Sequence, residues 1–125
     1  MVFSKQPERI LKEKSKKEVI TPMLTLPIKK KWLDMILSGK KKEEYREIKP
    51  YYISRFKNLF MMYPNSGFPM PGCSRQEILF RNGYRKDSPS FVAECSLDMG
   101  EGKKEWGAEK GNEYYILKIE KIVKN

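Results

Sequence analysis

Residues 39–46 read Gly-Lys-Lys-Lys-Glu-Glu-Tyr-Arg, and the interpretation of the whole chain starts from this stretch. Residues 42–48 are predicted to form a strand, with Glu43, Tyr45 and Glu47 on one face and Lys42, Glu44, Arg46 and Ile48 on the other. Glu44 and Arg46 are two residues apart, so the strand predicts that they share one face, about 7 Å apart, where they pair or jointly bind a polar ligand. Lys41 has the opposite parity and joins them only if it still belongs to the turn after the glycine.

A short amphipathic helix is predicted directly before this strand. Trp32, Leu33, Ile36 and Leu37 recur at the spacing of one helical face, which predicts a helix of about eleven residues, an ordinary length for a globular domain. The Ser-Gly pair that follows ends it, because glycine adopts the left-handed conformation at a helix end without steric cost. A short strand at residues 23–28 is predicted to lead into the helix.

The rest of the chain predicts one more helical or irregular segment and three strands. The aromatic-rich residues 51–60 form that segment, and the prolines and glycines of residues 63–72 then force a loop. Alternating apolar and polar side chains predict strands at residues 77–81, 91–98 and 114–123.

Two of these strands predict where single side chains lie. Cys95 alternates with polar neighbours and is therefore predicted to be a core thiol. In the last strand, the residues predicted to share one face are Tyr115, Leu117, Ile119 and Val123.

The segment between the last two strands, residues 98–111, combines four glycines with Trp106 in a charged run. A tryptophan in such a loop packs back onto the sheet as a lid, or it offers a surface on which a nucleobase stacks. Both interpretations stay open at this point.

The order of elements indicates an α+β fold, a small and mostly antiparallel β-barrel with one or two packed helices. Thr21-Pro22 marks the entry to this domain, because the residue before a proline is pushed toward extended conformations. Residues 23–125 are predicted to form the domain, and residues 1–22 a mobile basic arm.

The charge of the chain favours an anionic partner. The chain carries 26 Lys and Arg against 16 Asp and Glu, and residues 1–58 hold 16 of the basic and 7 of the acidic side chains, which is +9 of the net +10. Clustered basic side chains bind polyanions such as RNA, DNA or nucleotide phosphates by releasing counterions. A merely soluble basic protein is the alternative interpretation of the charge.

The composition also excludes several classes of site. Because the chain has no histidine, Ser-His-Asp and Cys-His machinery is excluded. Cys73 and Cys95 are too far apart for a CxxC motif and too few for a closed zinc site, so neither a metal nor a cofactor is expected. No stretch approaches the roughly 18 apolar residues of a membrane span, so we expect a soluble, cytoplasmic protein with no membrane partner.

Residues 81–86, Arg-Asn-Gly-Tyr-Arg-Lys, have two interpretations. The Asn-Gly pair is the strongest tight-turn dipeptide and favours a plain hairpin. Arg81, Tyr84 and Arg85 would otherwise line a cleft, since arginine near a turn commonly contacts phosphate. The charged residues 39–46 have a plain interpretation too, as a solvated strand edge.

In order, and set between a helix and a strand, Gly39, Lys41, Glu44 and Arg46 resemble the signature of the ASCH domain, a family of the PUA-like superfamily of small β-barrels. The similarity runs from about Met23 to Val123. Leu24–Trp32 resembles the opening strand and helix of the family, and Leu79–Tyr84 and Gly100–Gly107 look like a branch of it seen in bacteria and their phages.

This resemblance implies a cleft beside the helix that binds RNA or a modified nucleoside. Some relatives hydrolyse the amide of N4-acetylcytidine with a lysine and a threonine of this motif and a separate glutamate, and others have been linked to cleavage of RNA. Lys41 matches the family lysine, whereas Glu44 stands at the threonine position, where a carboxylate is a poor substitute for a hydroxyl nucleophile. Candidates for the separate glutamate are Glu94, Glu101 and Glu105.

We therefore expect a domain that binds RNA, a nucleotide or a modified nucleoside. The alternative is an enzyme on the same site, a nucleoside amidohydrolase of the N4-acetylcytidine type or a ribonuclease, with Lys41 and Glu44 as catalytic residues. A basic module that binds a partner and has no small-ligand site is a third possibility, which predicts that these charges do not converge on a concave pocket. The residues expected to contact the ligand are Lys42, Tyr45, Arg46, Arg81, Asn82, Tyr84, Glu101 and Trp106.

Overall fold

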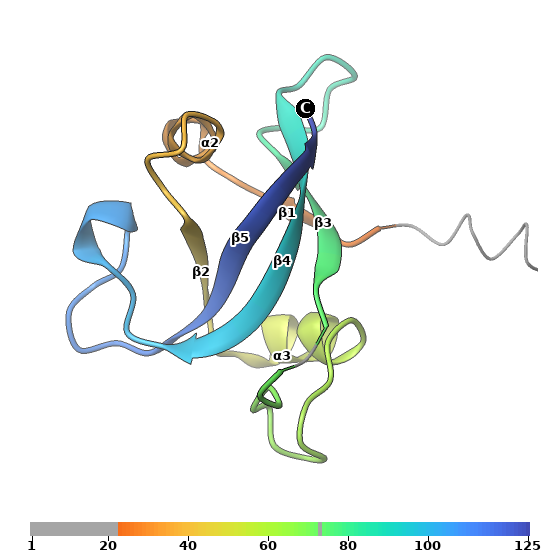
Figure 1. The fold of residues 1–125 in the computed structure, drawn as a ribbon, viewed down its shortest axis with the longest axis vertical. Helices are drawn as coiled ribbons and strands as arrows, with labels where there is room; N and C mark the ends of the chain where they lie inside the picture. Colours follow the sequence, from red (N-terminus) through yellow and green to blue (C-terminus); the bar gives the residue numbers. More distant parts are fainter. Residues whose placement is uncertain (1–22, 73) are drawn as a thin grey trace, which may run out of the picture.

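The structure, a computed structural model, describes residues 23–72 and 74–125 (Figure 1). The predicted basic arm and Cys73 lie outside these residues. Within them, two helices and a five-stranded sheet confirm the α+β class. The elements are β1 (Thr25–Pro27), α2 (Lys30–Leu37), β2 (Glu43–Glu47), α3 (Pro50–Lys57), β3 (Gln76–Arg81), β4 (Ser90–Gly100), the 3₁₀ turn η1 (Lys104–Trp106) and β5 (Tyr114–Lys124).

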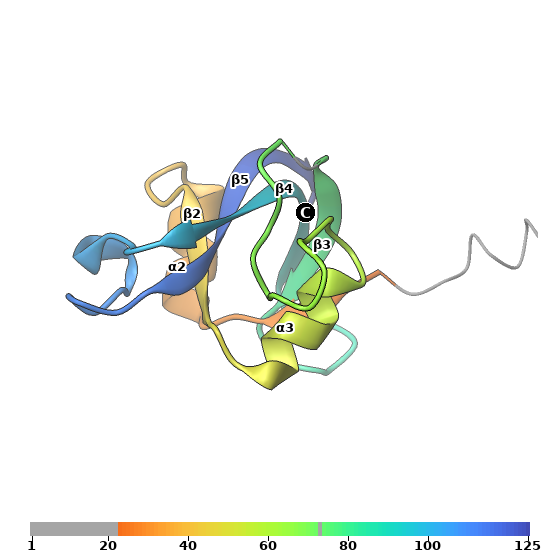
Figure 2. The same cartoon turned by 90° about the horizontal axis from the view of Figure 1, so that it is seen from below.

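The strands form one sheet in the order β1-β3-β4-β5-β2. β1 pairs in parallel with β3, and the other pairs are antiparallel, in agreement with the prediction of a mostly antiparallel sheet. Figure 2 shows the sheet curling into a half-barrel. β1 and β2 are its two end strands, so within the described chain each of them keeps one edge that no other strand pairs with.

The core fills the inside of the curled sheet, because alternate residues of each strand point toward it. In β4, Phe91, Ala93, Cys95 and Leu97 are buried and alternate with partly exposed residues. Cys95 is therefore a core thiol, as predicted, and burial raises its pKa to about 12. The other elements contribute the remaining buried side chains of the cluster, which are Leu26, Ile28, Leu33, Ile36, Phe56, Phe60, Ile78, Phe80, Tyr115 and Leu117.

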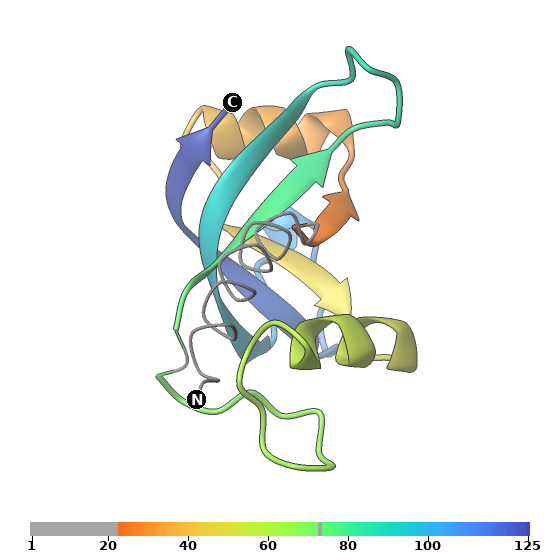
Figure 3. The same ribbon diagram turned by 90° about the vertical axis from the view of Figure 1, so that its right-hand side faces the viewer.

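The two helices lie at opposite ends of the half-barrel (Figure 3). α2 has 8 residues and is shorter than predicted, but it ends where expected: Gly39 adopts a φ of 85° and donates its N–H to the Ile36 carbonyl at 3.0 Å. α3 begins at Pro50, whose fixed φ suits the first helical position and whose missing N–H would have no intrahelical partner there.

The predicted tight turn at Asn82-Gly83 is wrong. β3 and β4 do form an antiparallel hairpin, but residues 82–89 connect them. The Asn82 N–H continues the ladder to the Pro89 carbonyl at 2.9 Å, and its side-chain amide donates to the Ile28 carbonyl at 2.8 Å. These two hydrogen bonds hold Asn82 in place against β4 and the β1–α2 junction, so the chain turns later.

The prediction that Val123 shares a face with Tyr115 and Leu117 is also wrong. Cys95 pairs with Ile119 and Glu94 with Lys121, so Glu120 is an extra residue in β5, a β-bulge. One extra residue exchanges the two faces of a strand. Val123 is consequently 42% exposed, and Ile122 packs against the core instead.

Candidate functional site

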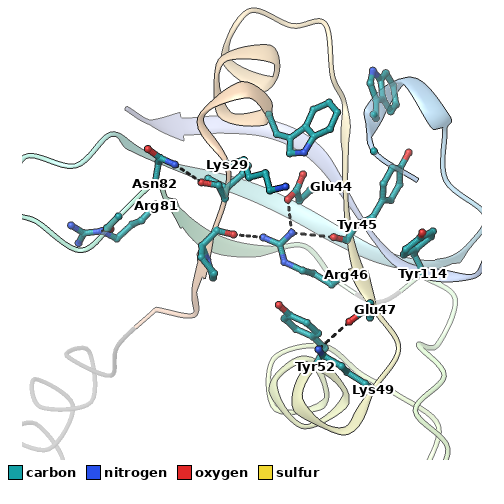
Figure 4. A pocket seen from close by; sticks show the side chains of 16 residues that line it. Lys29, Glu44, Tyr45, Arg46, Glu47, Lys49, Tyr52, Arg81, Asn82 and Tyr114 are labelled. Carbon is teal, nitrogen blue, oxygen red and sulfur yellow. Dashed lines mark hydrogen bonds and ion pairs between the residues drawn. The ribbon is translucent and has the colours of Figure 1, made fainter. Parts of the chain in front are cut away.

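A pocket of about 560 Å³ lies between β1 and β2, at the seam between the two end strands of the sheet (Figure 4). Its volume is in the range of small-molecule sites. We call it the seam pocket. Its aromatic lining residues are Trp32, Tyr45, Tyr52, Trp106 and Tyr114, and its charged ones are Lys29, Glu44, Arg46, Glu47, Lys49 and Arg81.

Arg46 bridges the two end strands across the pocket. Its Nη1 donates to the Glu44 carboxylate and to the Tyr45 carbonyl at 3.0 Å, both on β2, and its Nη2 donates to the Pro27 carbonyl on β1. As predicted, Glu44 and Arg46 share one face of their strand. The guanidinium thereby joins two strands that no ladder hydrogen bond connects.

Lys41 lies in the turn after Gly39 and its ammonium reaches Glu44, as the parity of the strand requires, but the two side chains do not share the seam pocket. Its Nζ is 3.0 Å from Glu44 Oε1, donates to the Trp106 carbonyl at 2.8 Å, and lies 4.7 Å from the centre of the Trp32 ring. The residue is 1% exposed. Burial lowers the pKa of this lysine from its ordinary value, and the Glu44 carboxylate opposes that shift.

Lys41 does not itself line the seam pocket. Its ammonium lies behind Glu44, with Trp32 on one side and Tyr45 on another, 5.0 Å from the centre of the tyrosine ring. A general base must come within hydrogen-bond reach of its substrate. In this arrangement Lys41 orients and balances the carboxylate, and Glu44 is the member of the pair that faces the pocket.

Glu44 is 4% exposed and lies between two cations, with Oε1 beside Lys41 and Oε2 beside Arg46. Two ionic partners offset the cost of burying its charge. A carboxylate so placed only accepts hydrogen bonds, and each of its oxygens has a second lone pair.

The main chain of β2 also contributes polar groups to the seam. Ile119 N–H donates to the Lys42 carbonyl at 2.9 Å, which places Lys42, Glu44 and Arg46 at the positions that hydrogen-bond to β5. The N–H and C=O groups of Tyr45 and Glu47 therefore point to the free edge. The hydrogen bond from Arg46 to the Tyr45 carbonyl agrees with this register.

The loop between β4 and β5 forms one wall of the pocket and is tied to β2 and to the turn before it. The Trp106 indole N–H donates to the Lys40 carbonyl at 3.0 Å, and the Lys103 N–H donates to the Tyr45 hydroxyl at 2.9 Å. Trp106 thus packs back onto the fold and lines the pocket as well. Burial raises the pKa of the Tyr45 phenol.

Basic side chains stand along the rim of the pocket. The Arg81 guanidinium donates to the carbonyls of Gly83 at 3.1 Å and Arg85 at 2.7 Å, which fixes its direction. Lys49 pairs with Glu47 at 3.0 Å and is half exposed, and Lys29 is exposed. In all, four cationic and two carboxylate side chains line the pocket.

The structure brings some of the expected ligand-contacting residues to this pocket and leaves others outside it. Tyr45, Arg46, Arg81, Asn82 and Trp106 line it together with Glu44. Three expected residues are exposed and do not line it: Lys42, Glu101 and Tyr84, which is 80% exposed. Glu94 and Glu105 do not line it either.

Among the charged and aromatic residues of the pocket, sequence reasoning missed Lys29, Trp32, Glu47, Lys49, Tyr52 and Tyr114. Trp32 was assigned only to the apolar face of its helix, although its position next to three lysines was a usable signal. Tyr52 and Tyr114 join the pocket because α3 follows β2 directly and β5 pairs with β2. The local sequence pattern does not predict that these two elements bring their tyrosines to the pocket.

Among the described residues, no group of three or more Cys, Asp or Glu side chains is arranged to hold a metal ion. No helix in the described part of the chain is long and apolar enough to cross a membrane. The chain matches no protein-family model, no curated protein and no solved structure.

Proposed function

We propose that the seam pocket binds one nucleotide unit of RNA or of a nucleotide-like ligand. The supporting observation is the combination of five aromatic rings and four cations around a single buried carboxylate, in a volume of about 560 Å³. Rings alone would suit many apolar ligands, and cations alone would suit any anion. A nucleotide needs both, because it joins a flat base to a charged phosphate.

Each part of the nucleotide has candidate partners in the pocket. Trp32 and Trp106 line the pocket with indole rings against which a base packs. Cations already lie over these rings: Lys31 and Lys41 Nζ are 4.6 and 4.7 Å from the centre of the Trp32 ring, and Lys103 Nζ is 4.6 Å from that of the Trp106 ring. Lys29, Lys49 and Arg81, at the rim, suit phosphate and sugar oxygens. Glu44 suits the amino or imino N–H groups of a base edge, because its carboxylate is an acceptor only.

We also propose that the chain is an ASCH-domain protein with a PUA-like fold. Lys41, Glu44 and Arg46 form one charged cluster, and Gly39 ends the helix α2, beside which the resemblance implies the ligand cleft. The half-barrel of five strands is compatible with that fold. Binding is proposed in preference to catalysis, because Lys41 lies behind Glu44 and does not line the pocket.

The test is a titration with the four common ribonucleoside monophosphates and a short single-stranded RNA. Both tryptophans of the chain line the pocket, so stacking of a base should quench their fluorescence. A ligand that binds only the native state must also raise the melting temperature. If none of these compounds changes either quantity, the proposed function is wrong.

A matched pair of lysine variants locates the binding. Lys29→Gln removes a pocket-rim charge and should weaken binding about fivefold, equivalent to ~1 kcal/mol, and reduce its salt dependence. Lys110→Gln removes an exposed lysine outside the pocket and should leave affinity unchanged. Equal effects of the two substitutions would place the ligand elsewhere.

A further inference from the structure

A small hairpin after α3 exposes apolar side chains on one face. Met62 bridges to Pro69, the Tyr63 N–H donates to the Phe68 carbonyl at 2.9 Å, and the Met70 N–H donates to the Met61 carbonyl at 3.0 Å. In this register Met61, Tyr63 and Phe68 share a face, and they are 60%, 47% and 54% exposed. Met62 has the opposite parity and packs against the core.

α3, the helix that precedes the hairpin, also exposes an aromatic ring beside a cation. Tyr51 is 50% exposed, and the Arg55 guanidinium, one helical turn later, lies 3.6 Å from the centre of its ring. Surfaces that bind single-stranded nucleic acid combine exposed aromatic rings, on which bases stack, with arginine side chains. Arg55 covers one face of the Tyr51 ring, so a base would stack on the other face. We call Tyr51, Arg55, Met61, Tyr63 and Phe68 together the α3–hairpin surface.

The hairpin is fixed to the body of the domain. The Tyr115 hydroxyl, from the core side of β5, donates to the Gly67 carbonyl at 2.7 Å, and the Ile53 side chain of α3 lies beside Gly67. The exposed rings are therefore held on a supported turn. Preorganised rings lose little conformational entropy when they contact a ligand.

The α3–hairpin surface adjoins the seam pocket at Tyr51 and Tyr52. Tyr52 lines the pocket, and its ring centre is 4.9 Å from that of its neighbour Tyr51. Lys49, just before α3, lines the pocket as well. α3 is 8 residues long and so spans about 12 Å, which a strand of a few nucleotides covers.

The charge of this region favours an anionic partner. Residues 48–76 contain four Lys and Arg and no Asp or Glu. Of these cations Arg55 belongs to the surface, whereas Lys49 pairs with Glu47 at 3.0 Å and Arg75 lies 3.7 Å from Glu94 and 3.6 Å from Glu120. An exposed aromatic surface with cations and no carboxylate of its own suits stacked bases and their phosphates. Double-stranded RNA does not fit, because its bases are already stacked.

On the basis of the proposed function, we propose that the ligand is a single-stranded RNA whose chain continues from the seam pocket across the α3–hairpin surface. One nucleotide unit occupies the pocket. Neighbouring bases stack on Tyr51, Tyr63 and Phe68, and Arg55 and Lys49 contact the phosphates. The preferred ligand is thus a strand and not a free nucleotide.

The experiment compares the affinities of a mononucleotide and of a 5′-labelled 12-nucleotide single-stranded RNA. The wild type should bind the RNA at least tenfold more tightly than the mononucleotide. Tyr63→Ser/Phe68→Ser should lose at least tenfold in affinity for the RNA, and its affinity for the mononucleotide should stay unchanged, since only the second surface is altered. Val123→Ser, at an exposed apolar position on β5, is the control and should bind both ligands normally.

The melting temperature checks that each variant is folded. If the double variant does not fold, Arg55→Gln replaces it, because Arg55 is exposed and its guanidinium contacts the ring and the carbonyl of Tyr51. Arg55→Gln should likewise lower the affinity for the RNA and leave the affinity for the mononucleotide unchanged.

The outcomes separate this inference from the proposed function. Normal mononucleotide binding with no loss of RNA affinity in the variants would overturn the inference alone. Absence of binding to both ligands in the wild type would overturn the proposed function. Binding of the wild type to phosphatidylserine vesicles, lost in the double variant while RNA affinity is unaffected, would assign the surface to a membrane and overturn the inference.

Discussion

At the scale of single residues, the three charges of the cluster around Glu44 have unequal roles. Glu44 contacts both Lys41 and Arg46, whereas within the described part of the chain each cation is paired with this carboxylate alone. Removing one member of a buried ion pair leaves the other charge uncompensated, and that is the costly step. Loss of the carboxylate should therefore destabilise the protein more than loss of the lysine.

Glu44→Gln should lower the free energy of unfolding by about 3 kcal/mol, because two cations then lack their anion. Lys41→Met should lower it by about half as much, since Glu44 keeps Arg46 and the methionine fills the space of the lysine stem. Urea denaturation of both variants measures the difference. An equal or larger loss for Lys41→Met would contradict this account of the cluster.

The contact between Lys41 and Glu44 was predictable from residues 39–46, because a turn and the strand after it are local structures. The contact between Arg46 and Pro27 was not. These residues are 19 positions apart, and they meet only because the sheet order places β1 and β2 at opposite ends of a curled sheet. The local sequence pattern does not indicate that β1 and β2 come close to each other.

At the scale of elements, the loop between β4 and β5 depends on a close approach of main chain to a ring. A Cβ on Gly102 would lie 2.4 Å from the Tyr45 ring, and that ring is held by hydrogen bonds of its hydroxyl to Glu43 and Lys103. The Tyr45 ring and the main chain at Gly102 therefore cannot easily separate to make room for a Cβ. The loop carries Trp106, so a shift of the loop reaches the pocket wall.

Gly102→Ala should therefore displace the loop, lower the free energy of unfolding by about 1–2 kcal/mol and weaken ligand binding. Amide hydrogen exchange should accelerate at Lys103 and Trp106 and stay unchanged in the sheet. Gly100→Ala is the matched control, because its Cβ would meet only Ile116 Cδ1, at 3.6 Å. Similar exchange in the two variants would show that the Tyr45 contact does not position the loop.

The residues that face the core were predicted correctly where apolar and polar side chains alternate without interruption, and incorrectly where a bulge interrupts the alternation. β4 alternates over its buried length, so its face assignment, including Cys95, is confirmed. β5 contains the bulge at Glu120, which exchanges its faces and exposes Val123. The Asn82-Gly83 pair failed as a turn signal because tertiary hydrogen bonds to Ile28 and Pro89 outweigh its local preference.

At the scale of the whole molecule, the uneven charge should govern the salt dependence of RNA binding. Residues 1–22 carry six basic and three acidic side chains. Deleting them removes no residue of the described core. The shortened protein should keep its melting temperature, bind RNA more weakly and show a shallower dependence of affinity on salt.

Thermal melts and RNA titrations at three salt concentrations measure both effects. Equal salt dependence with and without residues 1–22 would show that this segment does not contact RNA. A lower melting temperature of the shortened protein would show that the domain extends before residue 23.

The position of the pocket between β1 and β2 also bears on aggregation. Free strand edges recruit strands of other molecules and can seed fibrils, and many proteins cover or interrupt them for that reason. Here the free edges of β1 and β2 flank one narrow space, where the Arg46 guanidinium already occupies the Pro27 and Tyr45 carbonyls. An extended chain from a second molecule would have to displace that guanidinium before pairing. The arrangement proposed here to bind a nucleotide should therefore also hinder edge-to-edge polymerisation.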